Sequence, residues 1–249
     1  MNKCPSFRYP GGKVKFARQL VKYMPKQGRK FIDVFGGRGN ILFRAIHEGL
    51  EYDEWIVNDI ARAPFLRAIK EHGDKFRCTE RTIAEFDRLA ELAKRNDPHA
   101  LLMESWLAWS GSTYAASGRT TCGRMRTAAA YEANMRIACE YLRQKKVKIT
   151  QLDWLDCLEA EGLGAEDFVT YDPPYAGTDV RCYSCDSLSH LELVSYLKSA
   201  KHRWLLNESP EPLYLMAFGK PILKQRMQLR ITKFRKFQGW REECLWASK

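Results

Sequence analysis

The chain has 249 residues, of which 45% are hydrophobic and 12% aromatic, enough for one folded core with a modest insertion. It has no run of 18 or more uncharged apolar residues and no apolar segment after Met1. A membrane-spanning helix and a secretory leader are therefore not expected, and we predict a soluble, cytoplasmic protein. Eight cysteines at scattered spacings indicate reduced thiols rather than a disulfide framework.

The charge balance is strongly basic. The formal net charge is +11 and the isoelectric point is near 9.3. Basic residues gather at the two ends: no acidic residue precedes Asp33, and residues 220–249 are rich in Lys and Arg. A surplus of this kind displaces counterions from a polyanion, so it favours a nucleic-acid partner, although a merely soluble basic protein has the same composition.

The first clear unit along the chain covers residues 30–59. It consists of a β-rich run, a glycine turn, an amphipathic helix and a second β-rich run, at residues 31–35, 36–39, 41–49 and 55–57. This order predicts a βαβ unit with two parallel strands.

Helical patterns follow from about residue 61 to residue 146. Thr82 and Glu85 have the spacing of a capping box, and Asn96-Asp97-Pro98 ends one helix and begins another that reaches Trp109. Residues 110–126 are rich in Gly, Ser and Thr and predict an exposed loop. A further helix is expected over residues 128–144.

Strand patterns then return. They occupy residues 147–150, 168–171 and 204–206, with a helix around 191–197 and two antiparallel strands expected within 227–246. The fold class predicted is therefore α/β, with a sheet domain whose two halves flank an inserted helical segment.

The glycine turn and Asp59 form the first functional pattern. Glycines allow the backbone to approach a ligand closely at a helix N-terminus. Asp59 ends the second strand, where a carboxylate can accept hydrogen bonds from both ribose hydroxyls of a nucleoside. The sequence Gly36-Gly37-Arg38-Gly39 is not G-x-G-x-x-G, which argues against a nicotinamide cofactor. A tight turn with an incidental Asp remains an alternative.

The tetrapeptide Asp172-Pro173-Pro174-Tyr175 directly follows a predicted strand. An exocyclic amine on a base is a poor nucleophile because its lone pair is delocalised into the ring. The Asp172 carboxylate and the Pro173 carbonyl could accept its two N–H groups and free that lone pair, with Pro174 stiffening the loop. Tyr175 offers an aromatic face for a base swung out of a duplex.

These patterns together resemble those of the Dam-type, or alpha-group, DNA adenine-N6 methyltransferases, which depend on S-adenosylmethionine. Four segments carry the resemblance: residues 8–13 (RYPGGK), residues 31–40 (FIDVFGGRGN), Asn58-Asp59 and residues 172–175 (DPPY). The resemblance implies a Rossmann-like methyltransferase sheet, formed by residues 1–60 and 147–249, with a helical target-recognition insertion at 61–146. The usual asparagine-rich recognition pattern is not evident in the loop at 110–126, so the target sequence stays open.

The resemblance also implies roles for individual residues. Those expected around the methyl donor are Tyr9, Gly11, Lys13, Asp33, Phe35, Gly37, Gly39, Asp59, Asp153 and Asp172. Those expected at the base or the DNA are Trp154, Tyr175, Arg119, Arg124 and Arg126, and the catalytic group is Asp172, Pro173, Pro174 and Tyr175. The three arginines could read guanine edges or grip phosphates, and a solvated basic loop is the alternative.

The activity expected is therefore methylation of adenine in double-stranded DNA. Methylation of cytosine, methylation of RNA and a catalytically silent DNA-binding protein of the same fold are the alternatives. Cytosine enzymes more often carry serine in place of Asp172, which favours adenine. Cys182 and Cys185 lack the further ligands of a zinc site, so no metal is expected. The sequence leaves the oligomeric state open.

Overall fold

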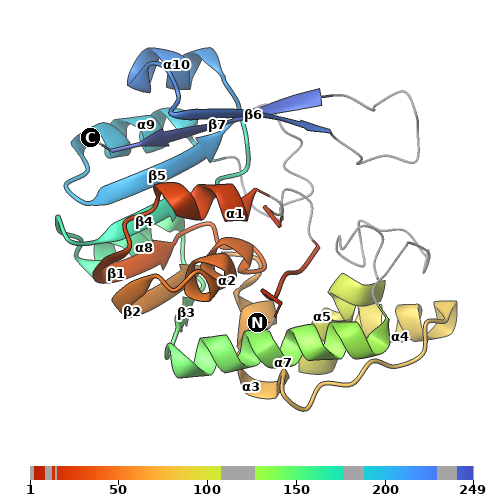
Figure 1. Ribbon diagram of the computed structural model, residues 1–249. Coiled ribbons are helices and arrows are strands. Elements are labelled where there is room, and N and C mark those ends of the chain that lie inside the picture. The colour runs from red at the N-terminus through yellow and green to blue at the C-terminus, as the bar shows by residue number, and fades with distance from the viewer. Residues whose placement is uncertain are drawn as a thin grey trace.

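The computed structural model describes residues 3–8, 13–14, 16–107, 127–176, 188–228 and 240–248. Within them, one sheet of seven strands has the order β3-β2-β1-β4-β5-β7-β6 (Figure 1). The strands are β1 (Gln27–Asp33), β2 (Glu51–Asn58), β3 (Lys148–Thr150), β4 (Phe168–Tyr171), β5 (Arg203–Glu208), β6 (Leu223–Gln228) and β7 (Trp240–Ala247). The first five pair in parallel, whereas β7 is antiparallel to β5 and β6. The predicted α/β, Rossmann-like fold class is confirmed.

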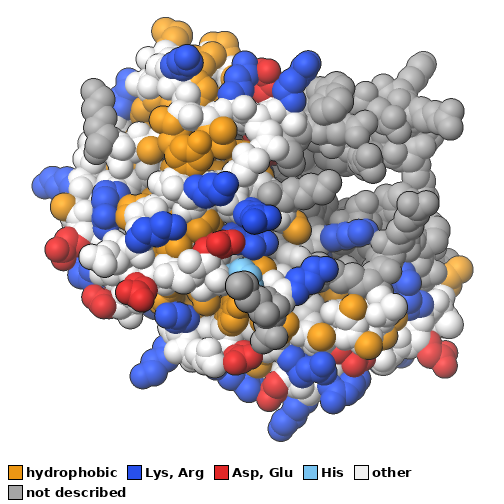
Figure 2. All heavy atoms as spheres, in the orientation of Figure 1, with side chains coloured by type: hydrophobic (Ala, Val, Ile, Leu, Met, Phe, Trp, Pro, Cys, Tyr) orange, Lys and Arg blue, Asp and Glu red, His pale blue; other side chains and the backbone are white. Residues whose placement is uncertain are grey.

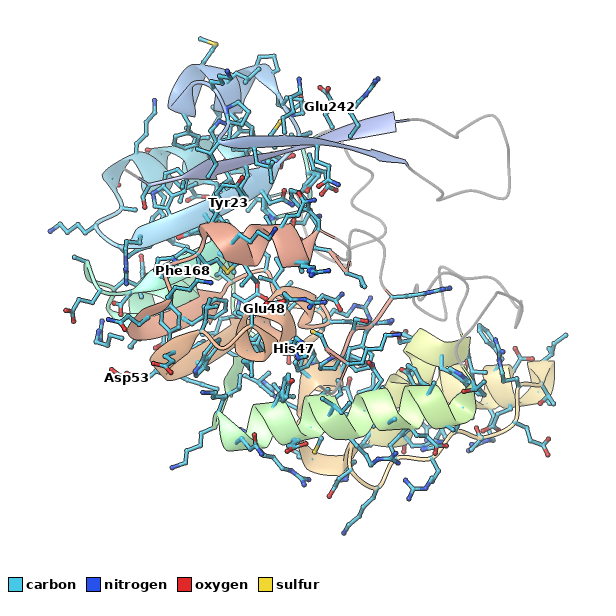
Figure 3. All side chains as sticks on the ribbon, in the orientation of Figure 1. Tyr23, His47, Glu48, Asp53, Phe168 and Glu242 are labelled. Atoms are coloured by element: carbon cyan, nitrogen blue, oxygen red, sulfur yellow. The ribbon has the colours of Figure 1, made fainter. Side chains whose placement is uncertain are left out.

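Helices cover both faces of this sheet. One face carries α1 (Ala17–Leu20), η1 (Val21–Tyr23), α2 (Asn40–His47) and α3 (Ala63–His72); the other carries α8 (Trp154–Glu161), α9 (His190–Ser199) and α10 (Pro212–Phe218). Successive strand residues point to opposite faces. Phe31 and Phe168 therefore belong to the core under α1 and α2, and Ile32 to the core under α8 and α9. Figure 3 labels Phe168 on β4 in the first of these layers.

The inserted helices are α4 (Ile83–Ala93), α5 (Pro98–Leu107) and α7 (Ala128–Gln144); α5 and α7 pack against α3, and α4 packs against α5. Thr82 caps α4 by accepting the N–H of Glu85, and Thr127 caps α7 by accepting the N–H of Ala130. The apolar side chains of these helices belong to the same core cluster as those of α2. The helical segment therefore shares its core with one face of the sheet.

The N-terminal segment is held between the sheet domain and the helical segment. Asn40 of α2 exchanges two hydrogen bonds with the backbone of Phe7, at 2.8 and 2.9 Å. Asn134 of α7 does the same with Ser6, at 3.0 Å in both directions. The ring of Phe7 meets those of Phe65 and Tyr131 edge to face. Residues 3–8 thus enter the core directly before the predicted donor-site residues that begin at position 9.

Most predicted elements are present, with different bounds. The helix predicted at 128–144 is found as α7, and the antiparallel pair predicted within 227–246 is β6 and β7. β1 begins at Gln27 rather than residue 31, and β6 begins at Leu223. Helices α8 and α10 were not predicted from the pattern. None of the helices in the described ranges combines the length and apolarity needed to cross a membrane.

A buried histidine makes a testable contribution to stability. His202 is 4% exposed, its Nε2 lies 3.0 Å from the Tyr171 hydroxyl, and burial lowers its pKa from 6.5 to about 4. Between these values the unfolded chain binds the proton more readily, so stability should fall as pH falls from 6.5 to 4, by about 3 kcal/mol in all. Urea unfolding across this range should show a steeper pH dependence for the wild type than for His202→Gln. Parallel profiles would contradict this account.

Candidate methyl-donor and catalytic site

The strand order changes direction at the carboxyl ends of β1 and β4, which is the edge where ligands bind in open α/β sheets. β1 lies between β2 and β4, and the connections on its two sides lead in opposite directions, which makes this the switch point of the sheet. Asp33, the last residue of β1, is in register with Thr170 of β4. Asp172 follows the end of β4 by one residue. The glycine turn, Asp33 and Asp172 therefore meet at one edge of the sheet.

Asp33 is a fully buried carboxylate, with 0% exposure. Neither of its oxygens makes a complete hydrogen bond within the described residues. Burial raises its pKa well above the ordinary value, and repulsion from Asp172 and Asp59 adds to the rise; the N–H of Leu42 in the first turn of α2 acts against it. An unpaired buried carboxylate is costly, so this group fits a ligand that brings a positive charge or N–H donors.

The glycine turn depends on glycine at two positions. A Cβ on Gly36 would lie 2.3 Å from Cγ2 of Val57 on β2. Gly39, which precedes α2, has φ of 76°, and a Cβ there would meet the Phe43 ring at 2.8 Å. The turn therefore packs tightly on β2 and leads directly into the N-terminus of α2, where the lack of side chains lets a ligand approach the backbone.

Asp59 ties the end of β2 to this turn. Its Oδ2 accepts the N–H of Gly37 at 2.8 Å, and its Oδ1 accepts those of Ala61 and Arg62 at 2.9 and 2.6 Å. The carboxylate is half-buried. Because each carboxylate oxygen has two lone pairs, Asp59 can still accept hydroxyl groups from a ligand while it holds the turn in place.

Asp172 is fixed through one of its two oxygens. Lys13 Nζ lies 3.0 Å from Oδ1, and Asn207 Nδ2 donates to the same oxygen at 3.0 Å. The structure records no hydrogen bond to Oδ2 among the described residues, and the side chain is 13% exposed. Two donors therefore orient the carboxylate and leave its second oxygen available to a substrate.

Tyr175 lies beneath Lys13 rather than on the open surface. The tyrosine is 6% exposed, Lys13 Nζ sits 4.5 Å from the ring centroid, and the hydroxyl accepts from Asn207 Nδ2. Glu243 of β7 lies 3.8 Å from the same ammonium, whereas its neighbour Glu242, labelled in Figure 3, pairs with Lys224 on β6. Within the tetrapeptide, Pro173 is buried and Pro174 is half-buried.

Asp153 and Trp154 stand at the start of α8. Asp153 is exposed and caps the helix by accepting the N–H of Leu155 at 2.9 Å. Trp154 is 5% exposed, with its ring beside those of Phe35 and Tyr196. In this arrangement the indole supports Phe35, which lies directly before the glycine turn, and presents little surface of its own to a base.

Several predicted residues lie outside the described ranges. They are Tyr9, Gly11, Arg119, Arg124, Arg126, Cys182 and Cys185. Among the described residues, no group of three or more His, Cys, Asp and Glu side chains has the arrangement of a metal site. On the face shown in Figure 2, Lys and Arg side chains are spread among acidic ones rather than gathered in one patch.

Sequence reasoning missed Asn207, Glu243 and Glu104. Asn207 comes near the end of a predicted strand, and its neighbours on β4 are set by strand pairing that the sequence pattern does not give. Glu243 reaches the site only because β7 inserts between β5 and β6. Glu104 lies in a helix that was assigned to the insertion alone. A polar residue at the end of a buried strand is the one sequence feature that could have indicated a site residue here, and of the three only Asn207 has this feature.

Asn207 yields a prediction that separates chemistry from donor binding. Asn207→Ala removes one of the two donors that orient Asp172 and leaves the glycine turn and Asp59 intact. A hydrogen bond to a charged group is worth about 1.5–3 kcal/mol, so we expect the methyl-transfer step to slow by about tenfold or more. Affinity for the methyl donor, measured by calorimetry, should stay within twofold. An unchanged single-turnover rate would show that Asn207 does not orient the carboxylate.

Comparison with known proteins gives one family match and one similar solved structure. No curated protein sequence matches the chain. The structure is similar to that of the rRNA methyltransferase aviRa from Streptomyces viridochromogenes, with a TM-score of 0.43 and 16% identity over 96% of this chain and 86% of that one. Residues 9–102 match the family described as D12 class N6 adenine-specific DNA methyltransferase. These residues make up less than half of the chain, and over them the match agrees with the family that the sequence resembles.

Proposed function

We propose that the protein transfers a methyl group from S-adenosylmethionine to the exocyclic amino group of adenine in double-stranded DNA. The observation that carries this proposal is the Asp172 carboxylate, held through Oδ1 by Lys13 and Asn207, with no hydrogen bond to Oδ2 among the described residues. The family match over residues 9–102 supports the reaction class, and the fit of Asp33 and Asp59 to a cationic nucleoside supports the donor.

The donor would be held by residues of β1, the turn and β2. Asp33, whose oxygens make no complete hydrogen bond within the described residues, would take a cationic group, and Asp59 would accept the ribose hydroxyls. Phe35, Gly37 and Gly39 would line the same space, with Tyr9 and Gly11 from the segment before Lys13. When bound, S-adenosylmethionine supplies an electrophilic methyl group on a sulfonium centre. The donor itself provides the electrophile, so the protein's task is to present the amine.

Asp172 would present the amine by accepting one of its N–H groups. That hydrogen bond favours a pyramidal nitrogen and localises the lone pair that the ring otherwise withdraws. The carbonyl of Pro173 would accept the second N–H, and the two prolines would keep the loop rigid and free of competing backbone donors. Lys13 and Asn207 keep Oδ1 occupied, so that Oδ2 is the oxygen that meets the amine.

The base must leave the duplex to reach this carboxylate. We assign Tyr175 to the wall of the base pocket, with its ring fixed by Lys13 and Asn207. Residues 61–146 would then serve as the target-recognition segment. The arginines that would contact phosphates or base edges there are Arg119, Arg124 and Arg126. For each phosphate contact that a variant loses, the slope of the logarithm of the DNA-binding constant against the logarithm of salt concentration would become shallower by about 0.9.

The proposed substrate class can be tested by following a labelled methyl group into different polymers. Incubation of the protein and labelled S-adenosylmethionine with duplex DNA, or with RNA of the same base composition, should label the DNA alone. Label in RNA alone would overturn DNA as the substrate. If calorimetry shows donor binding but neither polymer becomes labelled, across DNA of varied sequence, the chain binds without catalysing and the proposal fails.

A further inference from the structure

A buried carboxylate from the helical segment binds arginines from the two loops at the proposed donor site. Glu104 lies on α5 and is 5% exposed. Its Oε2 lies 2.7 Å from Nη2 of Arg38 and 3.3 Å from Nη1 of Arg62. Arg38 is the third residue of the glycine turn, and Arg62 is three residues beyond Asp59. One acidic group therefore joins two loops that come from different strands.

The two arginines are themselves tied to the residues expected to contact the donor. Arg38 is 1% exposed and donates through Nη1 to the carbonyl of Arg8 at 2.7 Å, directly before the segment that begins at Tyr9. The backbone N–H of Arg62 donates to Asp59, which also accepts the N–H of Gly37. Together these contacts form a closed ring. Glu104 binds the side chains of Arg38 and Arg62, and the carboxylate of Asp59 joins the loops on which these two arginines lie.

Because this ring of contacts is buried, it can fix the positions of the two loops that it joins. Removing one partner from a buried ion group leaves an uncompensated charge and is strongly destabilising, whereas an exposed pair contributes little. The arginines cannot relax into water without opening the core around Phe65, over whose ring the Arg38 guanidinium lies at 5.0 Å. The turn and the Asp59 loop are therefore held in one arrangement by a residue from outside the sheet domain.

We propose that Glu104 is a positioning residue for the methyl-donor site: through Arg38 and Arg62 it sets the geometry of the glycine turn and of the loop after Asp59. The proposal rests on the proposed function, in which the donor occupies these two loops. Its consequence is that donor binding requires α5, a helix of the segment otherwise assigned to DNA recognition. Donor affinity should depend on a side chain that does not itself reach the donor.

The chain offers a matched control for this proposal. Glu161 of α8 is 6% exposed and also forms ion pairs with two lysines, Lys30 at 2.9 Å and Lys148 at 2.7 Å. Its partners lie on β1 and β3 rather than in the turn. Glu104→Gln and Glu161→Gln therefore remove the same charge from a similar environment, and only the first disturbs the donor loops. General destabilisation should be comparable in the two variants.

The measurement is calorimetric binding of S-adenosylmethionine to each full-length variant without DNA. We expect Glu104→Gln to bind at least tenfold more weakly than wild type, with Glu161→Gln within twofold. In steady-state assays the KM for the methyl donor should rise in Glu104→Gln while the KM for DNA stays within twofold. Equal donor affinity in Glu104→Gln and Glu161→Gln would overturn the proposal, as would equal losses in both.

A second variant covers the case in which Glu104→Gln does not fold. Arg62→Gln keeps the 2.7 Å pair between Arg38 and Glu104 and removes only the longer contact. We expect its donor affinity to fall at least threefold relative to Glu161→Gln, and no difference would overturn the proposal. Failure of the wild-type protein to bind S-adenosylmethionine would instead contradict the proposed function, so the two failures are distinguishable.

Discussion

Asp172→Ala should reduce the rate of methyl transfer by about a hundred- to a thousandfold, because loss of one preorganised electrostatic partner has that cost. The amine would lose the acceptor that localises its lone pair. DNA affinity should change little, since most contacts that hold DNA are made to phosphates elsewhere. The measurement is the single-turnover rate with DNA and S-adenosylmethionine already bound, so that any change in affinity does not enter.

Asp172→Asn is the control for shape. It preserves the size of the side chain, and its amide can still accept a hydrogen bond, but it can equally turn an NH₂ toward the amine. Next to Lys13 Nζ and Asn207 Nδ2, the amide oxygen is drawn toward the position of Oδ1, which leaves the NH₂ at the substrate side. This variant should therefore be severely impaired as well. If both variants transfer methyl groups within a few-fold of the wild-type rate, Asp172 is not the acceptor.

Asp33→Asn should weaken donor binding while it stabilises the free protein. The wild-type carboxylate is fully buried without a complete hydrogen bond within the described residues, so its charge is a cost that the donor relieves. A charge-assisted contact contributes about 1.5–3 kcal/mol, which corresponds to about a 10- to 150-fold loss of affinity. Calorimetry with S-adenosylmethionine alone measures this loss. Wild-type affinity in the variant would remove Asp33 from the donor site.

The pH dependence of stability gives an independent readout for Asp33. Its folded pKa is raised well above the ordinary value, so the folded state binds the proton more readily than the unfolded chain. This contribution to stability is present below the ordinary carboxyl pKa and is lost as pH rises through the folded value. Thermal unfolding should therefore show Asp33→Asn gaining stability over wild type as pH rises. A difference that is constant across pH would contradict the assignment of the raised pKa to Asp33.

The fold could be predicted to the extent that local patterns determine it. The helix at 128–144 has caps and a regular apolar face, and its bounds were predicted correctly. The start of β1 was predicted four residues too late, because Gln27, Gly28 and Arg29 are not strand formers and this part of the strand is held by parallel pairing with β2. Helix α8 follows a short loop after β3, and its first residue, Trp154, was assigned to the base rather than to a helix face. The start of β1 and the helix α8 are therefore determined by strand pairing and packing rather than by the local sequence pattern.

The residues of the candidate site likewise include some that could be predicted from the sequence and some that could not. Asp59, the glycine turn and Asp172 were predicted from their places at strand ends, because carboxyl ends of parallel strands meet at one edge of a sheet, whereas Asp33 was implied by the family resemblance. Their partners could not be predicted. Lys13 was expected beside the donor and instead contacts Asp172, while Asn207 and Glu104 enter from segments distant in sequence. Ion pairs between distant segments depend on how helices and strands pack, which the periodicity of hydrophobic residues along the sequence does not predict.

The identity of the methylated nucleoside tests the central claim most directly. Duplex DNA would be incubated with wild-type protein and with Asp172→Ala, each with labelled S-adenosylmethionine, and then digested to nucleosides and separated. The account predicts labelled N6-methyldeoxyadenosine with the wild type and almost none with the variant. Label in N4-methyldeoxycytidine, or equal labelling of deoxyadenosine by both proteins, would contradict it.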